Sequence, residues 1–200
     1  MKTSSKRFTL IELLVVIAII GILAGLVFPA LGVVRNNAKK SKASSEIQSL
    51  KTAIIMYESE FSCWPAKTTG STDSLVKSDG TNSDYAKMCK ILTGENGKKM
   101  VFYEVGVGYD DTQGILDPWG RPYQVILDVD YDGKILNSVE AVAAVNEVNG
   151  RTGQDLRTKV AVFSISVPLN EKGYENTESV NKDKNKLKTL YTKKKLIISW

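Results

Sequence analysis

Residues 8–23 read FTLIELLVVIAIIGIL, and the apolar character continues as far as Val34. From Leu13 to Val34 there are 22 residues without a charge, almost all of them Leu, Ile, Val, Ala or Gly. At about 1.5 Å per residue, a helix of this length spans roughly 33 Å, which is enough to cross a hydrocarbon layer of about 30 Å. The run therefore predicts a membrane-spanning helix.

The polar residues 1–7 form a short leader that carries Lys2, Lys6 and Arg7 and no acid. Positive charge before an apolar run predicts that this end stays cytoplasmic and that the chain after the helix lies outside. A cleaved secretory signal is the competing interpretation, but its apolar region usually has only about 7–15 residues before a cleavage site. Because the run here is longer and leads into an amphipathic segment, a retained anchor is favoured.

Glu12 is the one acid inside the apolar segment. A carboxylate without a partner costs about 2.5 kcal/mol or more at full membrane depth. Two interpretations remain open. Glu12 lies close enough to the interface to stay hydrated in a single subunit, or it acquires a cationic partner when subunits assemble.

The segment from Phe8 to Leu23 resembles the N-terminal methylation motif of type IV pilins and type II secretion pseudopilins. The resemblance implies that a prepilin peptidase cuts before Phe8 and methylates the new α-amine. It implies that Glu12 pairs with the α-amine of a neighbouring subunit during assembly. Pro29 matches the family's helix-kinking proline, and a proline there removes one backbone hydrogen bond of the helix.

Arg7 departs from the family pattern, in which Gly normally precedes the cut. A peptidase site that selects a residue without a side chain would meet a long cation here. Cleavage between Arg7 and Phe8 is the prediction, and an uncleaved anchor is the alternative. Without cleavage, Phe8 has no free amine for Glu12 to meet.

The apolar stripe of residues 35–62 indicates that the helix continues beyond the membrane. The stripe recurs at spacings of three and four residues, as on one face of a helix, and consists of Ile47, Leu50, Ile54, Tyr57 and Phe61. We predict one helix over residues 9–62 that lays this stripe on a sheet. A coiled-coil seam is the weaker alternative, because the pattern lasts only about two heptads.

Residues 63–200 are expected to form one extracytoplasmic domain. Its Thr-, Ser-, Gly- and Asp-rich residues 67–84 predict a loop, and residues 85–92 a short helix ended by Gly94. The β-branched and aromatic runs predict strands at 99–103, 123–127 and 160–165. The expected fold class is α+β and pilin-like, with a long N-terminal helix packed on a small antiparallel sheet.

The heptapeptide DPWGRPY introduces the second predicted strand. Its prolines fix φ and Gly120 permits a tight reversal, so that Trp119 can pack under a fixed loop. The segment resembles the D-P-W-G-x-P-Y signature of the G-type pseudopilin of type II secretion, which implies a structural role for Asp117, Pro118, Trp119, Gly120, Pro122 and Tyr123. The C-terminal residues 197–200, IISW, also resemble that group's ending.

The chain contains no histidine, which removes Ser-His and Cys-His nucleophilic catalysis and the commonest zinc ligand. No motif places a catalytic base, so an enzyme is not expected. Cys63 and Cys89 could close one disulfide loop, worth about 3 kcal/mol in the chain-entropy model. Two free thiols are the alternative.

Alternating acids at Asp128, Asp130 and Asp132, followed by Gly133, begin like a calcium-binding loop. The twelfth position, which should supply a bidentate Glu, is Val139, and an acid-rich turn explains the run as well. No cofactor is expected, and a calcium ion at this turn is the one alternative that stays open.

G-type pseudopilins have a calcium site just before the terminal Trp, and the resemblance would place it near residues 193–195. This chain has Lys193, Lys194 and Lys195 there and no acid. Three cations would repel Ca²⁺, so that site is not carried over.

The formal net charge is +5, and the cations cluster at residues 35–42 and 182–195. Neither cluster has interleaved aromatics or a known reading module, so nucleic acid is not an expected partner. The expected function is that of a pseudopilin held in the bacterial inner membrane by one helix, with its C-terminal domain in the periplasm. Its expected partners are sister copies in a filament, other pseudopilins, inner-membrane secretion components, prepilin peptidase and lipid. The alternatives are a pilin-anchored binding module and a type IV pilus subunit.

Overall fold

The computed structural model describes residues 9–66, 73–78, 83–106, 108–167, 180, 183–193 and 195–200. The chain divides into two compact units, residues 1–39 and residues 40–200, and each is described here by itself. The predicted processing residues Arg7 and Phe8 lie outside the described residues.

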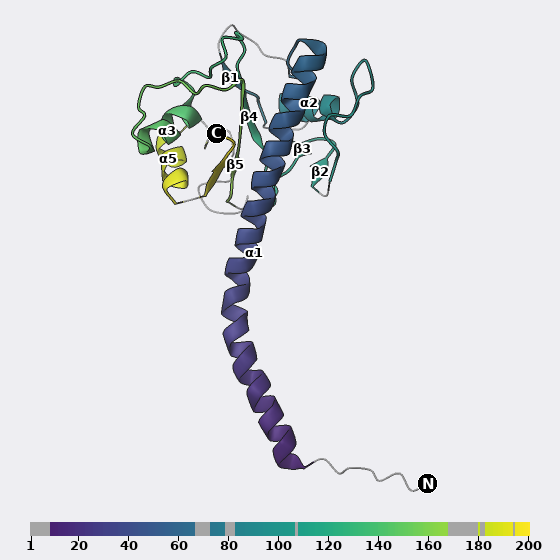
Figure 1. Ribbon diagram of the computed structural model, residues 1–200, viewed down its shortest axis with the longest axis vertical. Helices are drawn as coiled ribbons and strands as arrows, with labels where there is room; N and C mark the ends of the chain where they lie inside the picture. Colours follow the sequence, from purple (N-terminus) through teal and green to yellow (C-terminus); the bar gives the residue numbers. More distant parts are fainter. Residues whose placement is uncertain are drawn as a thin grey trace. The chain divides into compact units, whose positions relative to one another are not determined.

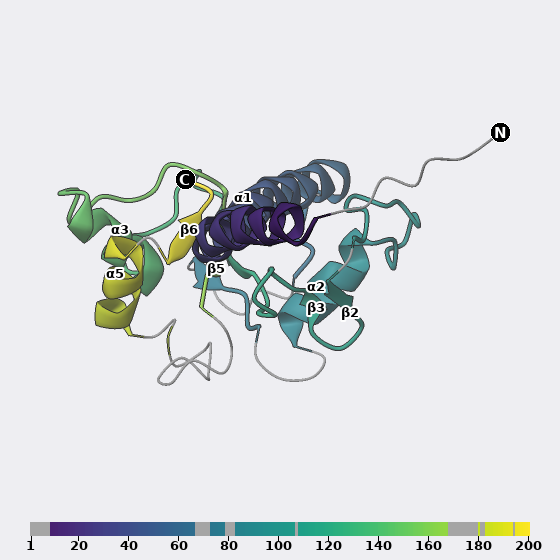
Figure 2. The same cartoon turned by 90° about the horizontal axis from the view of Figure 1, so that it is seen from below.

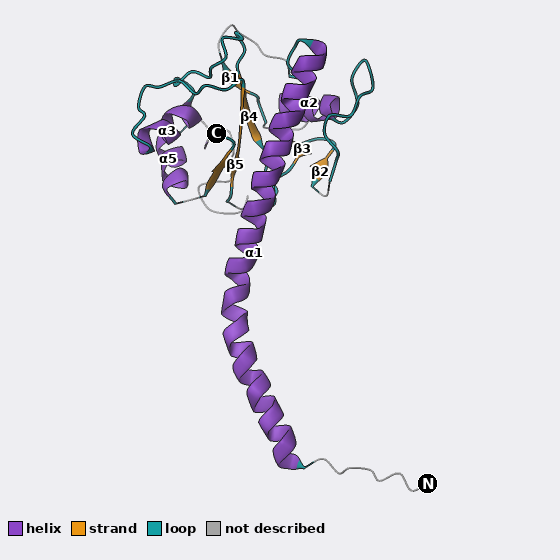
Figure 3. Ribbon diagram, in the orientation of Figure 1, coloured by secondary structure: helices purple, strands orange, loops and turns teal. Residues whose placement is uncertain are grey.

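Helix α1 (Leu10–Phe61) is the longest element, with 52 residues (Figure 3). Ser62 closes it with a positive φ of 53°, and its N–H donates to the carbonyl of Glu58 over 2.7 Å. Pro65 follows shortly after, as expected where a helix cannot continue. The helix predicted over residues 9–62 is therefore confirmed to within a residue at each end.

A four-stranded antiparallel sheet forms the centre of the second unit, in the order β1-β4-β5-β6. The strands are β1 (Ser74–Leu75), β4 (Gln124–Leu127), β5 (Val160–Ile165) and β6 (Leu196–Ile198). Val125 pairs with Val162, and Ser164 pairs with Ile197. A separate two-stranded ribbon joins β2 (Tyr109–Asp110) to β3 (Gly114–Ile115).

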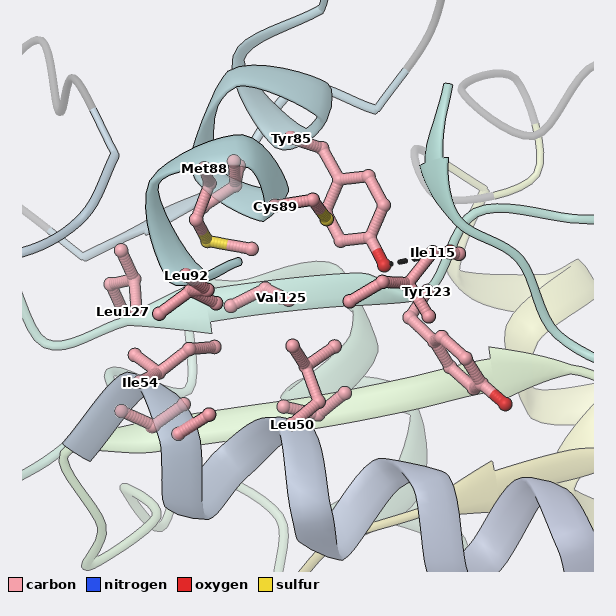
Figure 4. Close-up of a cluster of buried hydrophobic side chains, with 14 of the residues drawn as sticks. Leu50, Ile54, Tyr85, Met88, Cys89, Leu92, Ile115, Tyr123, Val125 and Leu127 are labelled. Carbon is pink, nitrogen blue, oxygen red and sulfur yellow. Dashed lines mark hydrogen bonds between the residues drawn. The ribbon is translucent and has the colours of Figure 1, made fainter. Parts of the chain in front are cut away.

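Alternate side chains of the sheet enter two different apolar cores. Val125 and Leu127 of β4 belong to the core that contains Leu50 and Ile54 of α1. Helix α2 (Asp84–Leu92) adds its own buried side chains to this core, and Figure 4 shows them directed toward the same cluster. The predicted α1 stripe is confirmed, since its residues 47, 50, 54 and 57 are buried.

The second core contains Ile126 of β4 and Phe163 of β5. Helices α3 (Glu140–Val148) and α5 (Lys184–Thr192) cover it and pack against each other. Figures 1 and 2 both show this helix pair at the end of the domain opposite α2 and the β2-β3 ribbon. The amphipathic character of both helices explains their position, because each buries one apolar side and leaves the other in water.

The α+β, pilin-like fold class is confirmed, as are the helix predicted at 85–92 and the strands at 123–127 and 160–165. The strand predicted at 99–103 is wrong. There the N–H groups of Phe102 and Tyr103 both donate to the carbonyl of Leu92, so the segment folds back on the end of α2. The side-chain amide of Asn96 also donates to the carbonyl of Met100 and accepts from its N–H. The loop predicted at 67–84 is wrong at Ser74–Leu75, which form β1.

Candidate functional site

The apolar half of α1 exposes its side chains. From Leu10 to Phe28, the large apolar residues whose side chains are described are 47–87% exposed. Soluble monomers rarely expose a contiguous apolar surface of more than a few hundred Å². This surface is therefore suited to be covered by lipid, by neighbouring copies of the chain, or by both.

Glu12 closes a capping box at the start of α1. Its Oε2 accepts hydrogen bonds from the backbone N–H of Thr9 over 2.8 Å and from Thr9 Oγ1 over 2.7 Å. In return, the N–H of Glu12 donates to Thr9 Oγ1 over 3.3 Å. This reciprocal pair satisfies backbone donors that the first helical turn leaves without partners. The T-x-x-E spacing could have revealed this role from the sequence.

Among the described residues, no single helix meets the length and composition expected of a membrane span. One bent pair of segments, Leu10–Leu26 and Leu31–Phe61, does meet it. The break between them contains Pro29, whose side chain lies outside the described part. The kinking role of Pro29 remains a prediction.

Asp117 organises the DPWGRPY loop. Its Oδ1 accepts from the backbone N–H groups of Trp119 and Arg121, each over 2.9 Å, and its Oδ2 accepts from Ser164 Oγ over 2.5 Å. Burial raises the pKa of this carboxyl, and these hydrogen bonds act in the opposite direction. Gly120, at φ 84°, makes the reversal that the sequence predicts. The loop is thus anchored to the central strand β5.

Two residues that the sequence did not single out complete this anchor. Arg121 is fully buried, and its Nε donates to the carbonyl of Val167 over 2.5 Å. Glu46 of α1 accepts a hydrogen bond of 2.5 Å from the hydroxyl of Tyr123, whose pKa is raised by burial and by this carboxylate. The loop therefore connects β5 to α1. Trp119 itself is only half-buried.

The disulfide considered between Cys63 and Cys89 is not formed, and both thiols are free. Cys63 is exposed just after α1, whereas Cys89 is buried on α2. Burial raises the pKa of the Cys89 thiol to about 11. Gly114, at φ 87°, passes so close that an added Cβ would lie 2.8 Å from the Cys89 sulfur. The thiol is therefore enclosed under β3.

The predicted calcium ligands are only partly brought together. Asp128 and Asp130 lie in one acidic group, with ligand oxygens within 4.8 Å of one another, but the third member is Asp73. Asp132 instead accepts from the backbone N–H of Lys134 over 2.8 Å and pairs with its ammonium over 3.6 Å. Asp73 was missed because it is 55 positions away from Asp128 in the chain.

Comparison with known proteins agrees with this geometry. Residues 8–28 match the prokaryotic N-terminal methylation motif. The chain is 34% identical over 125 residues to type II secretion system core protein G of Aeromonas hydrophila, covering 62% of this chain and 75% of the relative. The core protein G of Pseudomonas aeruginosa is 33% identical over the same shares of the two chains.

The type IV major pilin PilE of Neisseria gonorrhoeae is also similar, at 36% identity over 97 residues, which are 48% of this chain and 55% of the pilin. No solved structure matches the chain. The resemblance to core protein G extends from the apolar segment into the soluble domain and spans three quarters of two of these relatives. The chain belongs to the family of type II secretion system core protein G, the pseudopilins.

Proposed function

We propose that this chain is a membrane-anchored pseudopilin that polymerises through its N-terminal helix into a short periplasmic filament for type II protein secretion. The observation that carries the proposal is the exposed apolar surface of α1 between Leu10 and Phe28. Sister helices stacked with a constant offset would cover this surface by a heterologous contact, which builds an open helical assembly. Lipid covers the same surface before assembly.

The N-terminal motif supports the proposed processing and location. A prepilin peptidase would cut between Arg7 and Phe8 in the bacterial inner membrane, with the leader on the cytoplasmic side. The domain after α1 would lie in the periplasm, where it meets other pseudopilins and the inner-membrane secretion components. The mass of the membrane-extracted chain tests the cut, because a processed subunit begins at methylated Phe8.

Glu12 has two separable roles in this proposal, as the helix cap observed here and as the charge that meets a neighbour's α-amine. Glu12→Gln keeps an oxygen that can accept from Thr9 and removes the charge, since Gln also serves in a capping box. Glu12→Ala removes both. We expect both variants to insert into the membrane and both to lose assembly, measured by cross-linking of neighbouring subunits and by microscopy of filaments.

The matched control is Glu95→Ala, which removes an exposed glutamate of the soluble domain and should leave both insertion and assembly intact. Filaments of normal length from Glu12→Gln would refute the charge role and leave only the cap. Failure of either Glu12 variant to resist alkaline extraction from membranes would show that insertion, rather than assembly, had been lost.

A further inference from the structure

We propose that Asp73, Asp128 and Asp130 bind a calcium ion where β1 meets the end of β4. Their ligand oxygens lie within 4.8 Å of one another. Oxygens on opposite sides of a calcium ion are separated by about twice the 2.3–2.6 Å bond length, so this spacing fits one ion among them.

The sheet register brings these distant residues together. Ser74 of β1 pairs with Leu127 of β4, so Asp73, just before β1, lies next to Asp128, just after β4. Asp130 returns to the same place two residues later. The site therefore depends on long-range pairing rather than on a local calcium-loop sequence.

An unsatisfied buried oxygen points independently to a ligand. Asp128 is completely buried, and its Oδ2 accepts from the N–H of Gly133 over 2.9 Å. Its Oδ1 is buried and has no hydrogen-bond partner, and one oxygen of this carboxylate belongs to the acidic group. A buried carboxylate oxygen without a donor is strongly unfavourable, and a cation would satisfy it.

The surroundings hold the carboxylates in place. Asp73 accepts from the N–H of Val129 over 3.1 Å through Oδ1 and from the N–H of Leu136 over 2.7 Å through Oδ2. Trp64 Nε1 donates to the carbonyl of Asp128 over 2.7 Å, and the Trp64 ring stacks on Tyr131, which bends the chain at φ 59°. In the described ranges no Lys or Arg forms an ion pair with any of the three carboxyl groups, so these contacts hold them together without a cation from that part of the chain.

The chemistry of the site favours calcium over magnesium. All three ligands are hard carboxylate oxygens, and Asp130 is exposed, so water can complete the larger and variable coordination shell of Ca²⁺. Mg²⁺ requires shorter bonds in nearly octahedral geometry and loses its water reluctantly. The bound ion would link the two-residue strand β1 to the end of β4.

Calorimetric titration of the full chain in detergent, first freed of metal with a chelator, tests this site. We expect CaCl₂ to bind saturably with one ion per chain and to raise the unfolding temperature, and MgCl₂ to bind at least about tenfold more weakly. Asp73→Asn, Asp128→Asn and Asp130→Asn should each weaken calcium binding by about tenfold or more. Asp132→Asn is the matched control from the same loop and should bind calcium as the unchanged chain does.

No saturable calcium binding by the unchanged chain, or an equal loss in Asp132→Asn, would overturn the proposal. Asp128→Asn alters a buried position and could fail to fold, so the decisive variant is Asp130→Asn, whose side chain is exposed. Normal calcium binding by Asp130→Asn would likewise contradict the three-carboxylate site. Dispersed subunits suffice for this experiment, so its outcome is independent of filament assembly.

Discussion

Single side chains determine how the DPWGRPY loop is held. Asp117 uses both carboxylate oxygens, one for the loop's own N–H groups and one for Ser164 on β5. The sequence predicted the reversal at Gly120, because glycine and proline act locally. It could not predict Ser164, Arg121 or Glu46 as partners, because those contacts depend on which strand and helix pack beside the loop.

Asp117→Ala is expected to destabilise the soluble domain by about 3 kcal/mol, because it leaves two loop N–H groups and the Ser164 hydroxyl without their acceptor in a buried place. Urea unfolding followed by tryptophan fluorescence measures the change. Asp111→Ala removes an exposed acid from the β2-β3 turn and should change stability by less than about 0.5 kcal/mol. Equal effects of the two substitutions would show that the Asp117 hydrogen bonds do not stabilise the fold.

At the scale of elements, one face of the second half of α1 packs on the sheet and the other face is exposed. Leu50 is completely buried against the sheet, while Met56 on the same helix is 56% exposed. Leu50→Ala should therefore lower the free energy of unfolding by about 3 kcal/mol through lost burial and the cavity left behind. Met56→Ala should change it by less than about 0.5 kcal/mol. Denaturant unfolding checks both substitutions. A loss of stability in Met56→Ala as large as that in Leu50→Ala would contradict the packing of only one face of α1 on the sheet.

Helices α3 and α5 are linked by Glu147, which pairs with Lys184 over 3.0 Å and with Lys188 over 2.5 Å. These ammonium groups lower the pKa of Glu147 from its ordinary 4.5 to about 2. The ion pairs thus stabilise the fold fully above pH 4.5. Their contribution is lost progressively as the pH falls from 4.5 through about 2.

Glu147→Gln should therefore lower the urea midpoint at about pH 6 and reduce its loss on acidification to about pH 3. The control is Glu140→Gln at the exposed start of α3, which should follow the unchanged chain at both pH values. An identical acid response of Glu147→Gln and the unchanged chain would mean that the ion pairs do not stabilise the domain.

The elements that the sequence revealed are those with their own periodicity. The α1 stripe repeats for several turns, and the runs at β4 and β5 are β-branched, so local pattern suffices. Strands β1, β2 and β3 have two residues each, too few for any alternation to appear. The strand predicted at residues 99–103 is wrong because it is based on side-chain type. The backbone groups of this segment instead bond to the side chain of Asn96 and to the end of α2.

At the scale of the whole molecule, the two units differ in how much apolar surface they expose. The first exposes an almost continuous apolar surface, and the second has two closed cores and an exposed cysteine just after α1. The proposed topology therefore places Cys63 outside the cytoplasm, accessible to reagents that do not cross a membrane.

A membrane-impermeant maleimide should label intact spheroplasts at Cys63 alone. Cys89 should react only after unfolding, because it is buried and its pKa is raised to about 11, which leaves little thiolate. Cys63→Ser is the control that should abolish labelling, and mass spectrometry identifies the modified residue. Labelling of Cys63 only after lysis would reverse the proposed orientation.

The contact between Thr9 and Glu12 has a consequence for how a subunit joins its neighbours. In the single chain the Glu12 carboxylate already accepts two hydrogen bonds from Thr9 at the start of the same helix. In the proposed filament, a neighbour's α-amine would replace Thr9 as the donor to Glu12, so the net gain on docking would be the difference between these two sets of hydrogen bonds. Until that exchange, the cap would spare a single subunit in the membrane the cost of a carboxylate without a partner.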